Sequence, residues 1–518
     1  MVVFFVKRLL MSLLVVLIST LVMYYLVDWA IDPFEDLRTS TAPNKAEQIQ
    51  RRSDALHLDD SVFSRYLSWL KGASGCLYGN CDLNKNWKTN QEVTSLLSGA
   101  VLTTIKLVAA ATVLAIVLGV LVGIISALRQ YSGYDYSVTF LSFLLYSLPV
   151  FWVAVLAKVF LAIKFNDFLG DDPQISVPIV ILLALLAGLS VSAAVGGGWR
   201  RRLRDFAISA VVVIVLCLYL NLTDFFTTPQ LGIVLILLLS VGSAFVITEL
   251  STGVRNRKAL YASLSVAVLG AVLYLPLLYF WIYADDAGIL GWPLIIVMAL
   301  VGLVVSAAIG FAWGGPDRSR SARTAALTAI PVSMLLFIDR LMQSWQSYNN
   351  NQVIKGRPIA TLGSSTPNLV GNFWIQTLDS FTHLLLPTLT LILISFASYT
   401  RYTRASMLEV MNQDYIRTAR SKGLTERTVV MRHAFRNALL PLASIVPVDI
   451  ITLLGGAVLT ETVFGWFGMG RLFVDSLGNN QQYPVMAYIV IVGVLAVLAN
   501  FVADLIYAVL DPRIRVAA

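Results

Sequence analysis

Runs of apolar residues, most of them close to 20 residues long, recur along the whole chain and are separated by polar segments. About 20 predominantly apolar residues are needed for a helix to cross the hydrocarbon core of a bilayer. The pattern therefore predicts an all-α polytopic membrane protein with about twelve transmembrane helices. These lie near residues 9–30, 97–128, 136–163, 176–196, 205–222, 229–249, 259–283, 290–313, 324–345, 381–400, 440–463 and 484–508.

The polar segments between the runs alternate in charge. Segments after even-numbered runs are basic, as in "GWRRRLRD" and "GGPDRSRSARTA", whereas "KFNDFLGDDPQIS", "NLTDFFTTPQ" and "ADDAGILG" contain a single lysine among them. Lys and Arg are enriched in cytoplasmic loops of membrane proteins. We therefore expect both termini to be cytoplasmic and the protein to reside in the cytoplasmic (plasma) membrane.

The first apolar run raises the alternative of a cleaved signal peptide. It follows Lys7 and Arg8, is long for a signal peptide, and has no small-x-small cleavage site after it. Residues 1–30 are therefore expected to remain as the first transmembrane helix.

Composition agrees with a membrane protein, since 57% of the residues are hydrophobic and 13% are charged, against about 25% charged in soluble proteins. The net charge of +8 could suggest a nucleic-acid partner. However, Lys and Arg lie in short loops beside apolar runs, where they fix orientation in the bilayer. We expect a lipid bilayer and no nucleic acid as partner.

Two cysteines lie in the polar, glycine-rich stretch "GASGCLYGNCDLN" between the first two runs. If this stretch faces an oxidising exterior, a local disulfide between Cys76 and Cys81 is expected. A metal site would need two more ligands, and no nearby histidine supplies one. Cys217 lies inside an apolar run and is expected to be a buried small hydrophobe.

Enzyme motifs are missing from the sequence: there is no Walker-type phosphate loop, no paired zinc histidines and no nucleophile elbow. We therefore expect no enzymatic activity and no cofactor bound by this chain. Ionisable residues inside spans are the usual markers of a transport path. Asp449 and Glu461 are the candidates here, with pairing to a neighbouring helix as the alternative.

Charge inside the spans is otherwise sparse, which argues against an ion-driven secondary transporter, although twelve spans are common in that class. Another source of energy is then needed. The segment "DYIRTARSKGLTERTVVMRHAFRNALLP", from Asp414 to Pro441, is a basic stretch between two apolar runs. Asp414 and Thr425 are suited to cap two short helices, and Gly423 is suited to the left-handed turn between them. A simple lipid-binding surface helix would not need that turn.

This segment resembles the EAA loop of ABC-importer permeases of the dipeptide, oligopeptide and nickel group. "HLLLPTLTL", "TRASMLEV", "LLGGAVLTETVFGWFGMGRL" and "DLIYAVLDPRIR" resemble the same family, as do "FVKRLL", "LGVLVGIISAL" and "SLPVFW" nearer the N-terminus. The resemblance covers roughly residues 1–165 and 380–516. Arg417, Thr418 and Ala419 occupy the Glu-Ala-Ala places of the general motif, which is usual for the peptide group, and Phe467 stands where the family pattern has a proline. The largest departure is the block from about 166 to 380.

The resemblance implies a type I ABC-importer permease core that carries three inserted helical hairpins. The expected organisation is a first transmembrane helix (1–30), an extracellular domain (31–96), a first core part (97–165), inserted hairpins (166–345), an extracellular loop (346–380) and a second core part (381–518) with a cytoplasmic coupling loop (401–440).

The resemblance also implies the function: translocation of short peptides across the membrane, with nickel or another small solute as the alternative substrate. ATP and Mg would be used by two partner ATP-binding subunits, not by this chain. The other expected partners are a homologous second permease and an extracellular substrate-binding protein.

The residues expected to contact an ATPase are Arg417, Thr418, Ala419, Arg420, Lys422, Gly423, Leu424 and Arg427, with small Ala419 and Gly423 at the tip of the loop. Asp449 and Glu461 are the candidates for the translocation path or gate. Gly119 and Gly123, spaced as small-x-x-x-small, predict close helix packing.

Overall fold

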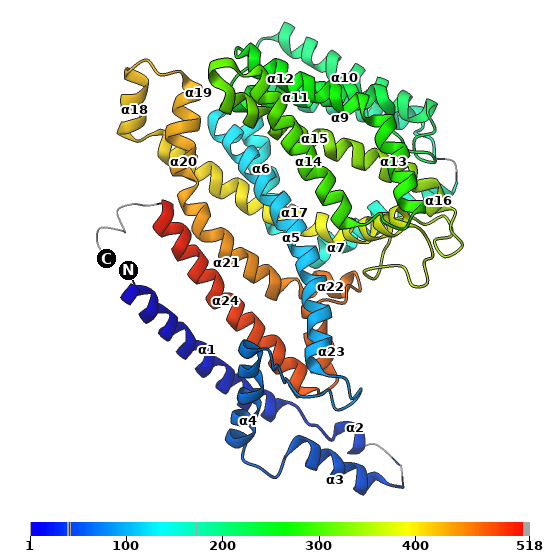
Figure 1. Cartoon of the computed structure of the whole chain (residues 1–518), viewed down its shortest axis with the longest axis vertical. Coiled ribbons are helices and arrows are strands. Elements are labelled where there is room, and N and C mark those ends of the chain that lie inside the picture. Colours follow the sequence, from blue (N-terminus) through cyan, green and yellow to red (C-terminus); the bar gives the residue numbers. More distant parts are fainter. Residues whose placement is uncertain (1, 39–40, 42, 172, 511–518) are drawn as a thin grey trace.

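The computed structural model describes residues 2–38, 41, 43–171 and 173–510 (Figure 1). Apart from one isolated bridge between Lys85 and Glu92, the regular structure of these residues is helical. Ten of the described helices are long and apolar enough to cross a membrane, or up to twelve if each of two bent pairs is one span. The polytopic all-α prediction is therefore confirmed. The long helices are α1 (Val2–Ala30), α5 (Val93–Leu128), α6 (Gly133–Ser147), α9 (Val177–Val195), α10 (Trp199–Leu222), α11 (Gly232–Ser251), α12 (Arg257–Val272), α13 (Tyr274–Asp286), α14 (Trp292–Trp313), α15 (Arg318–Gln343), α17 (Phe373–Met411), α21 (Leu440–Gly456) and α24 (Gln482–Leu510).

The two bent pairs differ from the straight spans expected at 136–163 and 259–283. Helix α6 is bent by 102° relative to the helical stretch that begins with α7 (Val150–Ala157), and the break contains Pro149. The residue before a proline disfavours helical geometry, and Leu148 is extended (ψ 132°). Helices α12 and α13 are bent by 49°. Apolar periodicity does not reveal such breaks.

The centre of the protein is the pairing of α5 with α17, which pack against each other along much of their lengths. A Cβ atom at Gly119 would lie 2.6 Å from the Cβ of Tyr399, and one at Gly123 would lie 2.7 Å from the Cβ of Thr403. The predicted close packing at these glycines is confirmed. Helices α21, α24 and α1 follow beside this pair, and Figure 1 shows α1 and α24 running antiparallel.

The residues between 166 and 345 form three hairpins, α9–α10, α11–α12 and α14–α15, with α13 completing the second. The last two hairpins pack together as a four-helix group, whereas α9 of the first packs against α6. In Figure 1 these green helices lie on one side of the α5–α17 pair. The hairpins therefore lie beside the α5–α17 pair.

A buried carboxylate holds the last two hairpins together. Asp339 of α15 accepts hydrogen bonds from the backbone N–H groups of Leu231 (2.6 Å) and Gly232 (3.2 Å) and from the Tyr274 hydroxyl (2.9 Å). It thereby satisfies N–H groups at the start of α11, which have no partner within the helix. A charged residue in the apolar run at 324–345 is explained by this bond network.

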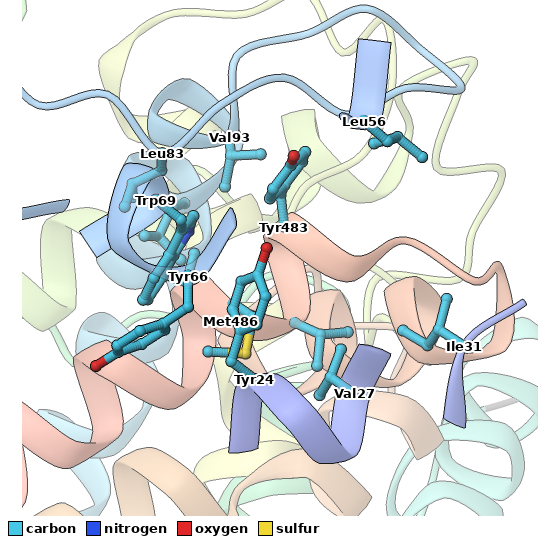
Figure 2. Close-up of a cluster of buried hydrophobic side chains, with 13 residues drawn as sticks. Tyr24, Val27, Ile31, Leu56, Tyr66, Trp69, Leu83, Val93, Tyr483 and Met486 are labelled. Atoms are coloured by element: carbon cyan, nitrogen blue, oxygen red, sulfur yellow. The ribbon is translucent and has the colours of Figure 1, made fainter. Parts of the chain in front are cut away.

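The polar segment after α1 folds into α2 (Glu35–Arg38), α3 (Lys45–Leu56) and α4 (Val62–Gly75). Figure 2 shows how it is attached: Tyr66 and Trp69 of α4 pack beside Tyr24 of α1 and near Tyr483 and Met486 of α24. Just after α4, Cys76 and Cys81 are joined in a disulfide. The segment is thus fixed to both ends of the chain through one aromatic cluster.

Candidate functional site

The candidate coupling loop is a helix, a turn and a second helix, as expected from its sequence. Helix α18 (Asp414–Ser421) ends before Gly423, which has a φ of 73°, a left-handed value that glycine adopts without strain. The hydroxyl of Thr425 accepts a hydrogen bond from the Thr428 N–H and caps α19 (Glu426–Thr428). The expected cap at Asp414 is corrected, because Gln413 is the cap position and Asp414 is the first helical residue.

The chain continues from α19 through a π-helical turn (Val429–Ala434) into α20 (Phe435–Ala438). One face of the loop is buried against the ends of α5 and α17. Ile416, Ala419 and Val429 form an apolar cluster with Ala127, next to the end of α5, and Met407 of α17. Ala419, expected at the tip beside Gly423, is instead buried. The loop is thus seated rigidly on the ends of α5 and α17.

The basic residues of the loop divide into two groups. Arg420 donates two hydrogen bonds to Glu426, at 3.1 and 2.7 Å, and these bonds raise the pKa of its guanidinium above the usual range. Arg427 donates to the backbone carbonyl of Glu249 in α11. Both side chains are thus engaged within the chain, and Arg420 holds the two helices of the loop together.

The tip of the loop offers a different set of side chains. Arg417 is largely exposed and lies 3.6 Å from Asp414, and Lys422 and Leu424 are exposed on either side of Gly423. Thr418 is also exposed, with its hydroxyl bonded to its own helix. Two cations and one apolar side chain beside an unobstructed glycine form a surface on which a partner could dock.

An ion pair between a partly exposed arginine and a buried carboxylate lies at the base of the loop and was not anticipated from the sequence. Arg404 of α17 donates to both carboxylate oxygens of Asp135 in α6, at 2.6 and 2.9 Å. Asp135 also accepts from the Ser126 hydroxyl (2.6 Å) and the Tyr131 N–H (3.0 Å). The only local signal was Ser132 as cap of α6, so the pairing across 269 positions was not visible.

Glu461, a predicted path or gate residue, is fully buried. Its carboxylate accepts from the Thr104 hydroxyl of α5 (2.6 Å) and from the Arg471 N–H (3.0 Å) at the start of α23 (Met469–Gly478). Thr104 in turn accepts from the Met469 N–H (2.8 Å). A Cβ atom at Gly468 would overlap this carboxylate. In this structure Glu461 therefore joins α5 to a helix start.

Asp449, the other predicted path residue, lies in α21 beside the hydroxyl group of Tyr399 in α17. Its side chain is partly exposed within the isolated chain, whereas Glu461 is not. The two acids thus have different neighbours. Within the described residues, no three His, Cys, Asp or Glu side chains are grouped so that they could hold a metal ion.

Comparisons with known proteins identify relatives of this chain. The family of binding-protein-dependent transport system inner membrane components matches residues 356–516, which include the coupling loop. The oligopeptide transport system permease protein OppB of Mycobacterium tuberculosis is 36% identical over 233 residues, covering 43% of this chain and 69% of the relative. AppB of Bacillus subtilis, an oligopeptide permease, is 48% identical over 137 residues, which cover 26% of this chain and 43% of the relative. DppB of Escherichia coli, a dipeptide permease, is 46% identical over 146 residues, which cover 28% of this chain and 42% of the relative.

Proposed function

Because this chain belongs to the family of binding-protein-dependent transport system inner membrane components, we propose that it is the permease subunit of an ATP-driven importer for short peptides. The relatives are named for oligopeptide or dipeptide transport, which favours peptides over nickel as the substrate. The relatives are transport subunits, and the chain itself catalyses no bond chemistry in this proposal.

The observation that carries the proposal is the coupling loop. It combines a rigid seat, formed by Ile416, Ala419 and Val429, with an exposed tip of Arg417, Lys422 and other residues around Gly423. A glycine tip lets another backbone approach closely, and exposed cations can pair with acids of a partner. A loop with these two features can bind a cytoplasmic ATPase subunit at its tip and transmit the movement of that subunit to the transmembrane helices.

The mechanical path runs from the loop into α17. This helix has 39 residues, far more than the roughly 20 that cross a bilayer, so it extends from the membrane to the loop. Arg404 near its end is fastened to Asp135, and the Ser406 hydroxyl donates to the Ala438 carbonyl (2.8 Å). A displacement of the loop by an ATPase is therefore passed to α17, and through the close contacts at Gly119 and Gly123 to α5.

The complete transporter in this proposal contains a homologous second permease, two ATP-binding subunits that use ATP and Mg, and an extracellular substrate-binding protein. Peptides cross between the two permeases. Asp449 stays the candidate for a residue near this path, because its side chain is partly exposed. The partners of Glu461 favour a positioning role for that residue. The proposal assigns residues 31–96 to the extracellular side, where they can contact the binding protein, and both termini to the cytoplasm.

Two experiments test the proposal. A deletion strain that lacks this chain is expected to lose growth on dipeptides or oligopeptides as the sole amino-acid source, and unimpaired peptide uptake would refute the peptide assignment. Gly423→Trp is expected to leave the protein inserted but to uncouple transport from ATP hydrolysis, since the indole blocks docking. Gly288→Trp is the matched control, because Gly288 also has a positive φ (68°) and open space around it. Normal uptake by Gly423→Trp would exclude the docking role.

A further inference from the structure

The turn between the inserted helices α11 and α12 lies against the coupling loop. Arg427 of the loop donates to the Glu249 carbonyl at the end of α11, and a Cβ atom at Gly253 would collide with the Arg427 guanidinium. Figure 1 shows α19 beside the ends of α11 and α12. An insertion absent from the resemblance to ordinary permeases thus contacts the element assigned to coupling.

The turn is rigid and strongly basic. Gly253 donates to the Thr248 carbonyl (2.8 Å), and Asn256 caps α12 by accepting from the Ala259 N–H (3.2 Å). Arg255 lies between Gly253 and Asn256, Arg257 and Lys258 follow Asn256, and all three side chains are exposed. The nearby Glu249 carboxylate accepts from the Val254 N–H (2.9 Å). Three cations are therefore presented from a fixed backbone.

A cleft of about 770 Å³ lies beside this contact, between the end of α11 and the loop. It is lined by apolar side chains, such as Leu250, Leu408 and Met431, and by Arg420 and Glu426 of the loop. The cleft reaches Glu249 and Leu250 of α11, which directly precede the basic turn, so a partner docked on the loop would lie next to that turn.

We propose that the α11–α12 turn is a second docking surface for the ATP-hydrolysing subunit, on which Arg255, Arg257 and Lys258 pair with acidic side chains of that subunit. The inference rests on the proposed function, because it needs an ATPase docked at the coupling loop. The alternative is that these cations bind anionic lipid headgroups, as basic turns at a membrane surface do. Attachment to the coupling loop through Arg427 and Gly253 favours the protein partner, since it places the cations beside whatever the loop binds.

The test compares two triple variants of the full chain in the assembled transporter. Arg255→Ala/Arg257→Ala/Lys258→Ala removes the proposed contact. Arg200→Ala/Arg201→Ala/Arg202→Ala is the matched control, since it removes three exposed arginines from the first turn of α10, in the hairpin whose α9 packs on α6. The dissociation constant of the ATPase subunit is measured at several NaCl concentrations. The measurement is made in nanodiscs of phosphatidylcholine alone and in nanodiscs that also contain phosphatidylglycerol.

The first triple variant is expected to bind the ATPase subunit about tenfold more weakly and with a smaller salt dependence in both lipids, because three exposed ion pairs are lost. The control triple variant is expected to bind as the unmodified chain does. Unchanged binding by the first triple variant overturns the inference. An effect of both triple variants that appears only with phosphatidylglycerol also overturns it and assigns the turn to the membrane surface.

Gly423→Trp separates this inference from the proposed function. If Gly423→Trp releases the ATPase subunit and the first triple variant does not, only the second surface is refuted. If Gly423→Trp leaves the subunit bound, the docking role of the loop itself is refuted. A second measurement does not depend on removing charge: a photo-crosslinker at Arg255→Cys is expected to form an adduct with the ATPase subunit, and one at Arg201→Cys is not.

Discussion

Thr104 and Glu461, which are 357 positions apart in the sequence, meet inside the protein with their side-chain oxygens 2.6 Å apart. The same carboxylate accepts from the Arg471 N–H, so α5, α22 (Val458–Val463) and the start of α23 are joined at one buried group. A carboxylate that receives several hydrogen bonds in a buried place is costly to remove, because its donors lose their partners.

The first prediction concerns this carboxylate. Glu461→Ala is expected to destabilise the protein by about 2–4 kcal/mol, since the Thr104 hydroxyl and the Arg471 N–H are left buried without acceptors. The measurement is the thermal unfolding midpoint in detergent. Thr462→Ala, one residue on, is the control with an exposed hydroxyl bonded to its own helix. Equal unfolding midpoints for both variants would contradict the positioning role. If Glu461→Gln is as stable as the unmodified protein but does not transport, Glu461 would instead be assigned to the translocation path.

The contrast between Glu461 and the glycines of α5 shows what the sequence could and could not predict. Gly119 and Gly123 form a pattern within one helix, so their close packing was predictable without knowing the partner helix. The partners of Glu461 and Asp135 lie hundreds of positions away, and only the arrangement of the helices brings them together. Local patterns therefore gave the spans and the helix-turn-helix loop.

The loop itself illustrates the same limit. Gly423 and Thr425 act within a few residues of themselves, and their turn and cap roles were predictable from local chemistry. Ala419 was expected at the tip because it is small, but it is buried because one face of α18 packs on the ends of α5 and α17. Which face of a short helix is covered depends on neighbours that a single sequence does not show.

The second prediction concerns the α5–α17 contact. Gly123→Val is expected to destabilise the protein by about 3 kcal/mol or more, because its side chain would overlap Thr403 and the Thr400 carbonyl. Gly99→Val in the same helix is the control, since nothing lies within 4 Å of a Cβ atom there. The fraction of folded protein recovered by size-exclusion chromatography and its unfolding midpoint are compared. If the two variants behave alike, the contact at Gly123 does not hold the helices together.

The third prediction concerns the ion pair at the base of the loop. A double-mutant cycle with Asp135→Ala and Arg404→Ala is expected to give a coupling energy of about 2–3 kcal/mol, because removing either partner leaves the other charge poorly compensated. Arg404→Lys is expected to rescue little, since lysine cannot reproduce the two-pronged contact with the carboxylate. Unfolding in denaturant measures the cycle. Additive single effects would show that the pair does not act as a unit.

The last prediction concerns the orientation of the protein in the membrane. Cys76 and Cys81 are exposed on the segment placed outside, whereas Cys217 is buried. In Cys76→Ser, the thiol of Cys81 is no longer in a disulfide and is expected to react with a membrane-impermeant maleimide added to right-side-out vesicles. The unmodified chain is expected to react only after reduction, and Cys76→Ser/Cys81→Ser reports any reaction at Cys217. If Cys76→Ser is labelled only after the vesicles are opened, the proposed orientation is reversed. The coupling loop would then lie outside the cytoplasm, because that loop and Cys81 were assigned to opposite sides of the membrane by the same alternation of charge.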